Sequence, residues 1–547
     1  MRKKRILAEW MPEIVVSIRK HYSLRSFSSD IRAGLLVSVV AFPLFMTFAI
    51  ASGASPMIGI ITSVIAGSLA CLCGGSRFQI VGPTGAFAMI VADIIKIHGF
   101  EGMTCALIMA GILMIIFALL HIGDLIHYVP YPITAGFTAG IGLSIIVAQL
   151  GNFLGLQLQS VPANFFCRLS YYFSRLDTVN GYALALGLFS LIFLEIMQKY
   201  RPQFPRYLVI LLIGIGYSSF FPNVGLETVG SKFGDIAHNL PVFSVPEQFF
   251  SFTNLRKLFP AAFAIAFLGS LESLLGAVIS DNLSGQKHRS NMELFGQGVA
   301  NLGSAVFGGI PATCALGTTS LNVKVGAQTP VAGLCNALLI MLYVFCLGDF
   351  IKIIPLSCLA AMLLTTAWNM AALTKNKYIF LAPKSDSSVF ILTILTTLLV
   401  DIVIAVEVGL IMSAFLFIKR SVETTKIEIC SKTIHNIKGK TCECESLKVC
   451  GHLFFGAAPI LNNALKSLPK THDIIYIDMQ NVPFIDATGA KVLKEFVVEA
   501  KEKHIQVIIG GLDNRIRKAL RKMDSSGELQ GAYSDDVSEE PSAVRGQ

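Results

Sequence analysis

The sequence predicts an α-helical polytopic membrane protein that carries a small α/β domain at its C-terminal end, and three observations support this. Of its 547 residues, 53% are hydrophobic and only 14% are charged, with a mean hydropathy of +0.65, whereas about a quarter of a soluble domain is charged. Apolar segments about 20 residues long, the length of a membrane span, follow one another between residues 31 and 418. After residue 427, short strand-like and helix-like runs alternate instead.

The apolar segments are expected to be helices, because backbone groups in lipid must be paired within the protein. We place fourteen spans, at 31–52, 54–73, 77–97, 103–120, 131–150, 182–198, 207–221, 259–280, 294–308, 310–324, 330–346, 355–370, 388–401 and 403–418. An even number of spans puts both ends of the chain on one side. Lys and Arg gather at the N-terminus and in the loops on that side, which predicts cytoplasmic termini in a cell membrane. The same bias explains the net charge of +9, so no nucleic-acid partner is expected.

The third and tenth spans are interrupted by Gly and Pro, in the runs GGSRFQIVGPTGAF (74–87) and FGGIPATCALGTT (307–319). Each is the third element of a seven-span half. Short, broken segments at matching places in two halves indicate the binding site of an inverted-repeat transporter. The alternative is a pair of poorly packed helices or re-entrant loops.

A half-helix that begins inside the membrane leaves its first N–H groups without helical partners and carries partial positive charge there, which suits an anion. Pro83 is expected in the first turn of such a helix, followed by the Thr84 hydroxyl. In the tenth span, Ala315, Leu316 and Gly317 are expected to expose their amides. Two such ends facing each other would hold a small oxyanion without a basic side chain.

Glu272 lies well inside the eighth span, in FLGSLESLLGAV. A carboxylate at that depth is costly when it is ionised, which makes Glu272 a candidate proton carrier. The alternative is a structural glutamate that binds a break in a neighbouring helix.

The C-terminal part shows strand-like runs at 473–479 and 504–510 and helical spacing at 491–503 and 514–523. We therefore divide the chain into a cytoplasmic N-terminal segment (1–30), a transmembrane domain (31–420), an α/β domain (427–523) and a tail (524–547). The tail is rich in Ser, Gly, Asp and Glu, and is expected to be disordered.

The motifs, taken in order, resemble those of the SulP anion-permease family over about 28–523. They are PLFMTFAIASGASP (43–56), GGSRFQIVGPTGA (74–86) and the run from LESLLGAV through FGGIP (271–311). The run IDMQNVPFIDATGAKVL (477–493) resembles that of a STAS domain. Thr488 in this run is interpreted as a helix N-cap. In related regulatory domains, the Ser or Thr at this position can be phosphorylated, and such a domain implies a regulatory protein partner.

The resemblance implies seven plus seven inverted spans, divided into a core (spans 1–4 and 8–11) and a gate (spans 5–7 and 12–14). It also implies a homodimer and an elevator-like motion. Carried over by position, the family's anion site comprises five residues: Phe48, Thr84, Ala315, Leu316 and Gly317.

Three departures from the family pattern affect the expected mechanism. Leu44 stands where Gln is frequent, and Thr318 stands where many members have Arg. Sodium-linked relatives have side-chain oxygens at the positions of Gly276 and Leu316, which have none here. Because a sodium ion needs several oxygen ligands, we expect proton coupling through Glu272.

The leading hypothesis is therefore proton-coupled sulfate symport by a secondary active transporter. Bicarbonate or a dicarboxylate is an alternative substrate within the family, because one scaffold can serve several anions. A nucleobase permease of the same fold, a channel, and a membrane-anchored anion sensor that signals through the STAS domain are further alternatives. No motif indicates an enzyme, a cofactor or a metal site.

Overall fold

The computed structural model describes residues 10–19, 22–124, 130–158, 161–162, 165–201, 204–221, 225–234, 243–246, 251–371, 377–400, 402–437, 440–468, 474–524, 527–529 and 532. The chain divides into two compact units, Met1–Leu410 and Ile411–Gln547.

The first unit is helical, and each of the fourteen predicted spans contains a described helix, although the third and tenth are helical only from Gly85 and Leu316 onward. Six of the described helices are long and apolar enough to cross a membrane. The helices are α2 (Glu13–Arg19), α3 (Leu24–Ala51), α4 (Pro56–Cys73), α5 (Gly85–Leu119), α6 (Tyr131–Leu154), α7 (Phe165–Phe173), α8 (Gly181–Tyr200), α9 (Arg206–Phe220), α10 (Val229–Phe233), α11 (Phe252–Ser284), α12 (Ser290–Val306), α13 (Leu316–Lys324), α14 (Val331–Lys352), α15 (Leu356–Ala371), α16 (Lys377–Leu381), α17 (Lys384–Leu399) and α18 (Ile402–Glu423).

The third and fourth spans are the two halves of α5, which Gly99 separates. Gly99 has φ 70° and ψ 179°, a conformation that residues with a side chain rarely adopt. It falls between the predicted ends at 97 and 103. The long helix is therefore two spans joined by a break.

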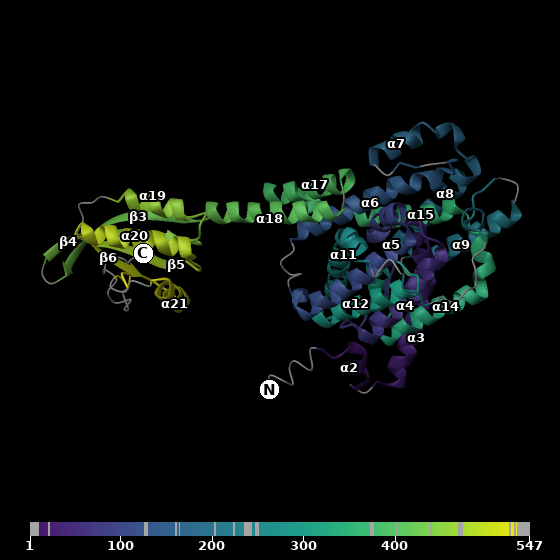
Figure 1. Cartoon of the computed structure of the whole chain (residues 1–547), viewed down its shortest axis with the longest axis horizontal. Helices are drawn as coiled ribbons and strands as arrows, with labels where there is room; N and C mark the ends of the chain where they lie inside the picture. The colour runs from purple at the N-terminus through teal and green to yellow at the C-terminus, as the bar shows by residue number, and fades with distance from the viewer. Residues whose placement is uncertain are drawn as a thin grey trace. The chain divides into compact units, whose positions relative to one another are not determined.

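The packing partners divide the helices into the two predicted groups. Helices α3, α4, α5, α11, α12, α13 and α14 pack mainly on one another and form the core. Helices α6, α8, α9, α15 and α17 form the gate, with α15 and α17 against α6. Each group combines helices from both halves of the chain, so that α4 and α5 lie beside α12 (Figure 1). The prediction of a core and a gate built from two repeats is confirmed.

The interrupted spans begin as extended chain. The two-residue strand β1 (Val81–Gly82) pairs antiparallel with β2 (Thr313–Cys314), with Val81 opposite Cys314 and Gly82 opposite Thr313. Helix α5 then starts at Gly85, and Thr84 is its N-cap. Placing Pro83 in the first turn of the helix was therefore wrong: Pro83 precedes the cap, because the chain stays extended through Thr84 (φ −127°, ψ 160°).

The second unit contains a four-stranded sheet in the order β3-β4-β5-β6. Strands β3 (Lys426–Ile437) and β4 (Lys440–Cys450) are antiparallel, whereas β5 (Ile474–Asn481) and β6 (Gln506–Gly510) extend the sheet in parallel. The helices are α19 (Ala458–Lys466), α20 (Ala487–Glu502) and α21 (Asn514–Met523). Leu529 and Ala532 are buried in the hydrophobic core of this unit, and residues 533–547 lie outside the described residues.

Candidate functional site

The β1-β2 ribbon positions the N-termini of two half-helices. Because the strands are antiparallel, the chain leaves the ribbon in opposite directions, entering α5 three residues after Gly82 and α13 two residues after Cys314. The N-termini of α5 and α13, which carry the partial positive charge of the helix dipoles, therefore both lie next to this short, buried ribbon. This is the arrangement that the two interrupted spans predicted.

At the start of α5, Thr84 is buried, and the N–H groups of Gly85 and Ala86 have no acceptor among the described residues. The Phe48 ring lies beside this end. A Cβ built on Gly85 would meet Phe48 Cε1 at 3.1 Å and Ile145 Cδ1 at 2.9 Å. A side chain at this position would crowd both of them, at a site where the core helix α3 meets the gate helix α6.

At the start of α13, the structure corrects one predicted donor. The Ala315 N–H donates to Ile80 O at 2.9 Å, so this amide is already paired. The amides of Leu316 and Gly317 have no acceptor among the described residues. Gly317 is exposed, and a Cβ built on it would meet no atom within 4 Å. This amide therefore borders open space of the kind that a ligand needs.

Glu272 lies at the same junction. Thr84 Oγ1 donates to Glu272 Oε2 at 3.1 Å, across 188 residues of sequence, and the Glu272 side chain is buried. A Cβ on Gly276, one turn further along α11, would meet Cys314 Sγ at 2.1 Å and Leu316 Cδ2 at 3.2 Å. The space next to the carboxyl group is thus filled by a thiol and an aliphatic side chain, and neither is a ligand for a hard cation.

Polar side chains that the sequence reading did not single out hold the interrupted backbone in place. Asn301 Nδ2 donates to Ala312 O, and Asn301 Oδ1 accepts from Ala312 N, both at 2.9 Å. Thr319 Oγ1 accepts from Ile80 N at 3.0 Å, and Thr62 Oγ1 accepts from Ile310 N at 2.9 Å. A signal was present in the sequence, because buried polar groups inside apolar spans must have partners.

No basic side chain replaces the family's arginine on the tenth half-helix. Thr318 is buried, and its Oγ1 donates to Ala315 O at 3.0 Å. Arg77, at the other break, pairs with Glu13 at 2.6 Å. Backbone amides and dipoles are therefore the groups offered to an anion here.

A separate cavity of about 710 Å³ lies between the core and the gate. Met89 and Ile90 of α5 line it one turn after the start of that helix, together with Ser144 of α6 and residues of α11, α17 and α18. Its charged lining residues are Asp93, Arg168, Lys257 and Glu407. None of the predicted site residues lines this cavity.

In the second unit, the N-cap of α20 is Asp486 rather than Thr488. Asp486 Oδ1 accepts from Gly489 N at 2.8 Å, and Oδ2 accepts from Phe455 N at 2.9 Å. The N-cap interpretation of Thr488 was therefore wrong, because the helix begins two residues earlier and the Asp486 carboxylate accepts from the first-turn amide. Thr488 is exposed in the first turn of the helix.

Two paired half-helix ends, buried between a core and a gate, are features of a membrane transporter for anions. Residues 27–394 match the model of the sulfate permease family and residues 443–537 match that of the STAS domain. The chain belongs to the sulfate permease family of anion transporters, which confirms the resemblance seen in its motifs.

Two relatives and one solved structure illustrate this membership. The chain is 37% identical over 507 residues to the putative sulfate transporter YvdB of Bacillus subtilis, covering 92% of this chain and 95% of the relative. It is 29% identical over 540 residues to the bicarbonate transporter BicA of Picosynechococcus, with 93% of each covered. A solved structure of SLC26A9 shares the fold, with a TM-score of 0.86 at 17% identity over 98% of this chain and 93% of that one. The relatives are transporters, as expected for a chain that is not an enzyme.

Proposed function

We propose that this protein imports sulfate together with protons, and that the anion is held between the N-termini of α5 and α13. The single observation that carries the proposal is the Thr84–Glu272 hydrogen bond, which places a buried carboxyl group beside one of the two half-helix ends. An ionised carboxylate there repels an anion, whereas a protonated one does not. Binding of the anion is thereby linked to binding of a proton.

The site residues of this proposal are Phe48, Thr84, Leu316 and Gly317, with Ala315 as the N-cap of α13. Their free donors are the amides of Gly85, Ala86, Leu316 and Gly317, and Phe48 covers one side of the α5 end. Sodium coupling is disfavoured because Cys314 and Leu316 occupy the space beside Gly276.

The transport cycle we propose moves the core against the gate in an elevator-like manner. The anion site and Glu272 belong to core helices, while Ile145, which contacts the start of α5, belongs to the gate. Displacement of one group past the other would carry the site across the membrane. We further propose a homodimer with cytoplasmic termini in the cell membrane, and a STAS domain that binds a regulatory protein and is modified at Thr488.

Bicarbonate is the second candidate substrate, because BicA is described as a bicarbonate transporter and aligns over 93% of this chain. Backbone amides recognise oxyanions by charge and size, so both ions suit the same donors. The substrate test is uptake of labelled sulfate into proteoliposomes with an imposed pH gradient and no sodium. Unlabelled sulfate, bicarbonate, oxalate, succinate and uracil serve as competitors.

We expect sulfate to compete most strongly and uracil not to compete. If bicarbonate competes most strongly, bicarbonate replaces sulfate as the proposed substrate. Competition by uracil alone would favour a nucleobase permease. Removal of the residues after Arg420 separates transport from signalling, because a transporter should still bind its anion without the C-terminal unit.

A further inference from the structure

A chain of buried polar side chains leads away from Glu272 through the interior of the core. Gln79 Nε2 donates to the backbone oxygen of Ser273, the neighbour of Glu272, at 2.6 Å. Gln297 Nε2 lies 3.3 Å from Gln79 Oε1 and 3.2 Å from Glu293 Oε1. The backbone of Ser273, next to Glu272, is thus joined by three hydrogen bonds to a second carboxyl group.

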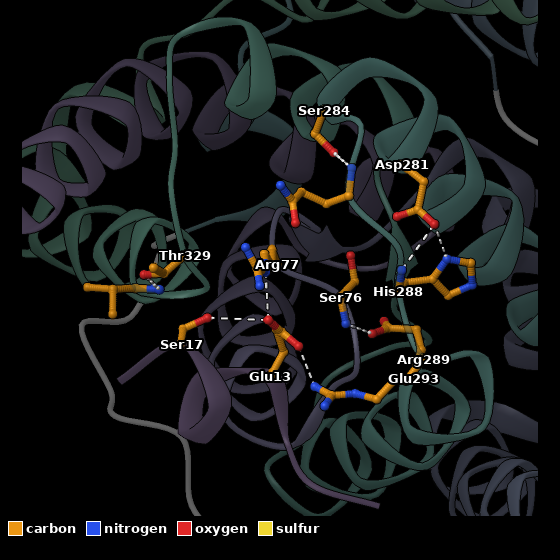
Figure 2. A network of polar contacts seen from close by, with 12 residues as sticks. Glu13, Ser17, Ser76, Arg77, Asp281, Ser284, His288, Arg289, Glu293 and Thr329 are labelled. Atoms are coloured by element: carbon orange, nitrogen blue, oxygen red, sulfur yellow. Dashed lines mark hydrogen bonds and ion pairs between the residues drawn. The ribbon is translucent and has the colours of Figure 1, made fainter. Parts of the chain in front are cut away.

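Glu293 is in the first turn of α12 and is 2% exposed. Its Oε2 accepts from Gly75 N at 2.9 Å. It also accepts from Ser76 N at 2.8 Å, in the segment that joins α4 to β1 (Figure 2). Burial of a carboxylate is costly unless partners compensate for it. Two amides and Gln297 supply that compensation.

A histidine lies between the helix that carries Glu293 and the aqueous edge of the core. The Nε2 of His288 contacts Ser290 Oγ at 3.1 Å, at the start of α12. The His288 Nδ1 lies 2.7 Å from Asp281 Oδ2, and the Asp281 side chain is 22% exposed (Figure 2). The loop 285–289 that carries His288 is one of the basic loops assigned to the cytoplasm.

Unpaired polar atoms lie along the same route. Ser273 Oγ, Gln297 Oε1 and Ser76 Oγ are buried and have no hydrogen-bond partner among the described residues. Buried polar atoms of this kind are normally satisfied by ordered water. Their positions, beside Glu272, in the middle of the chain and beside Glu293, are those at which water would complete a continuous hydrogen-bonded path.

The Cys314 thiol is buried beside α11, one turn after Glu272, where a Cβ built on Gly276 would meet its Sγ at 2.1 Å. The other titratable groups that act on Glu293 are His288 and, on α4, the thiol of Cys71. Neither thiol carries a fixed charge, which leaves the two carboxyl groups and His288 to exchange protons.

We infer that Glu293 is a second proton-carrying group of the transport cycle, relaying protons between Glu272 and the cytoplasmic face at His288 and Asp281. This inference rests on the proposed function. A proton leaves the Glu272 carboxyl group, passes along hydrogen-bonded water and is accepted by the Glu293 carboxylate. It then leaves Glu293 for the cytoplasm by way of the His288–Asp281 pair, which restores the Glu293 carboxylate. The Glu272 carboxylate takes up its next proton from the outer side, together with the next anion. Gln79 and Gln297 are positioning residues that orient the path.

A purely structural role for Glu293, as an anchor for the amides of Gly75 and Ser76, makes a different prediction. Glu293→Gln keeps an acceptor for these amides but cannot carry a proton. The test compares two readouts in proteoliposomes: accumulation of labelled sulfate driven by a pH gradient, and counterflow of sulfate at equal pH, which needs no net proton movement.

For Glu293→Gln we expect accumulation to fall at least tenfold while counterflow stays within about threefold of the unmodified protein. The matched control is Glu13→Gln, because Glu13 is also a buried acid beside this segment, paired with Arg77 and Arg289, but lies off the path (Figure 2). It should retain accumulation.

Accumulation by Glu293→Gln at the unmodified level, or loss of counterflow together with accumulation, would overturn the relay. If Glu272→Gln abolishes accumulation and Glu293→Gln does not, the relay fails and proton coupling stands. If the unmodified protein does not accumulate sulfate in response to the pH gradient, both the relay and the proposed proton coupling are refuted. If Glu293→Gln does not fold, Gln297→Met tests the relay by the same two readouts. Accumulation is then expected to fall, and counterflow is expected to remain.

Discussion

Thr84 Oγ1 donates a hydrogen bond to Glu272 Oε2 at 3.1 Å, joining the cap of one half-helix to a carboxyl group on α11. The two residues come from opposite halves of the chain and meet where the extended segments pair. Through this contact, the charge state of Glu272 acts on the N-terminus of α5, one of the two ends proposed to hold the anion.

Thr84→Val removes the hydroxyl donor and keeps the shape of the side chain. A hydrogen bond to a charged group contributes about 1.5–3 kcal/mol, so we expect proton-driven uptake to fall by roughly tenfold or more. The control is Thr104→Val, because Thr104 Oγ1 donates only to Phe100 O within its own helix. Initial rates of labelled sulfate uptake give the comparison, and equal rates for Thr84→Val and Thr104→Val would refute the role of the hydroxyl.

Gly317→Leu is expected to abolish anion binding without unfolding the protein. The new side chain enters space in which no atom lies within 4 Å of the Cβ, and that is the space assigned to the anion. Gly216→Leu on α9 is the control, because its Cβ also meets no atom within 4 Å. Sulfate binding by calorimetry should be lost in the first variant and kept in the second. Retained affinity in Gly317→Leu would place the anion elsewhere.

The sequence predicted the spans and the two breaks well, because both leave strong local signals. Long apolar runs require helices, and Gly99 or the Gly-Pro clusters at 74–87 and 307–319 interrupt them for reasons of backbone geometry alone. Glu272 was identified because an acid inside a span is rare.

What the sequence could not supply is pairing between distant segments. The hydrogen bond from the Ala315 N–H to Ile80 O depends on the β1-β2 ribbon, which joins residues more than 200 positions apart. The strands β3 and β4 were missed because they are rich in polar residues and pair mainly with each other and β5. Asp486 and Thr488 are both suitable caps, and the structure distinguishes them because Asp486 accepts from Gly489 N and also from Phe455 N.

Asp30→Ala should destabilise the first unit strongly. The buried Asp30 carboxylate accepts four hydrogen bonds, from Tyr22 Oη, Gln328 N, Thr329 N and Thr329 Oγ1. Buried donors left unpaired cost about 1–3 kcal/mol each, so a loss of about 3 kcal/mol or more is expected. Thermal unfolding in detergent measures it. Ser29→Ala removes one hydrogen bond, to Gly326 O, and should lower the midpoint temperature of unfolding much less. Equal shifts of this temperature in the two variants would show that the Asp30 hydrogen bonds add little stability.

Asp486→Ala should loosen the start of α20, because both of its acceptor bonds are lost. Loss of an N-cap costs about 1 kcal/mol. Hydrogen exchange of the intact protein should therefore speed up at the first turn of α20 by about fivefold. Thr488→Ala should leave exchange unchanged, because Thr488 is exposed and is not the cap. Faster exchange in Thr488→Ala than in Asp486→Ala would instead identify Thr488 as the cap.

The most direct test of the account is accumulation of labelled sulfate by Glu272→Gln in proteoliposomes with a pH gradient and no sodium. The unmodified protein should concentrate the anion above its external level, and Glu272→Gln should only equilibrate it. Concentration of sulfate by Glu272→Gln to the level of the unmodified protein would contradict proton coupling through this carboxyl group.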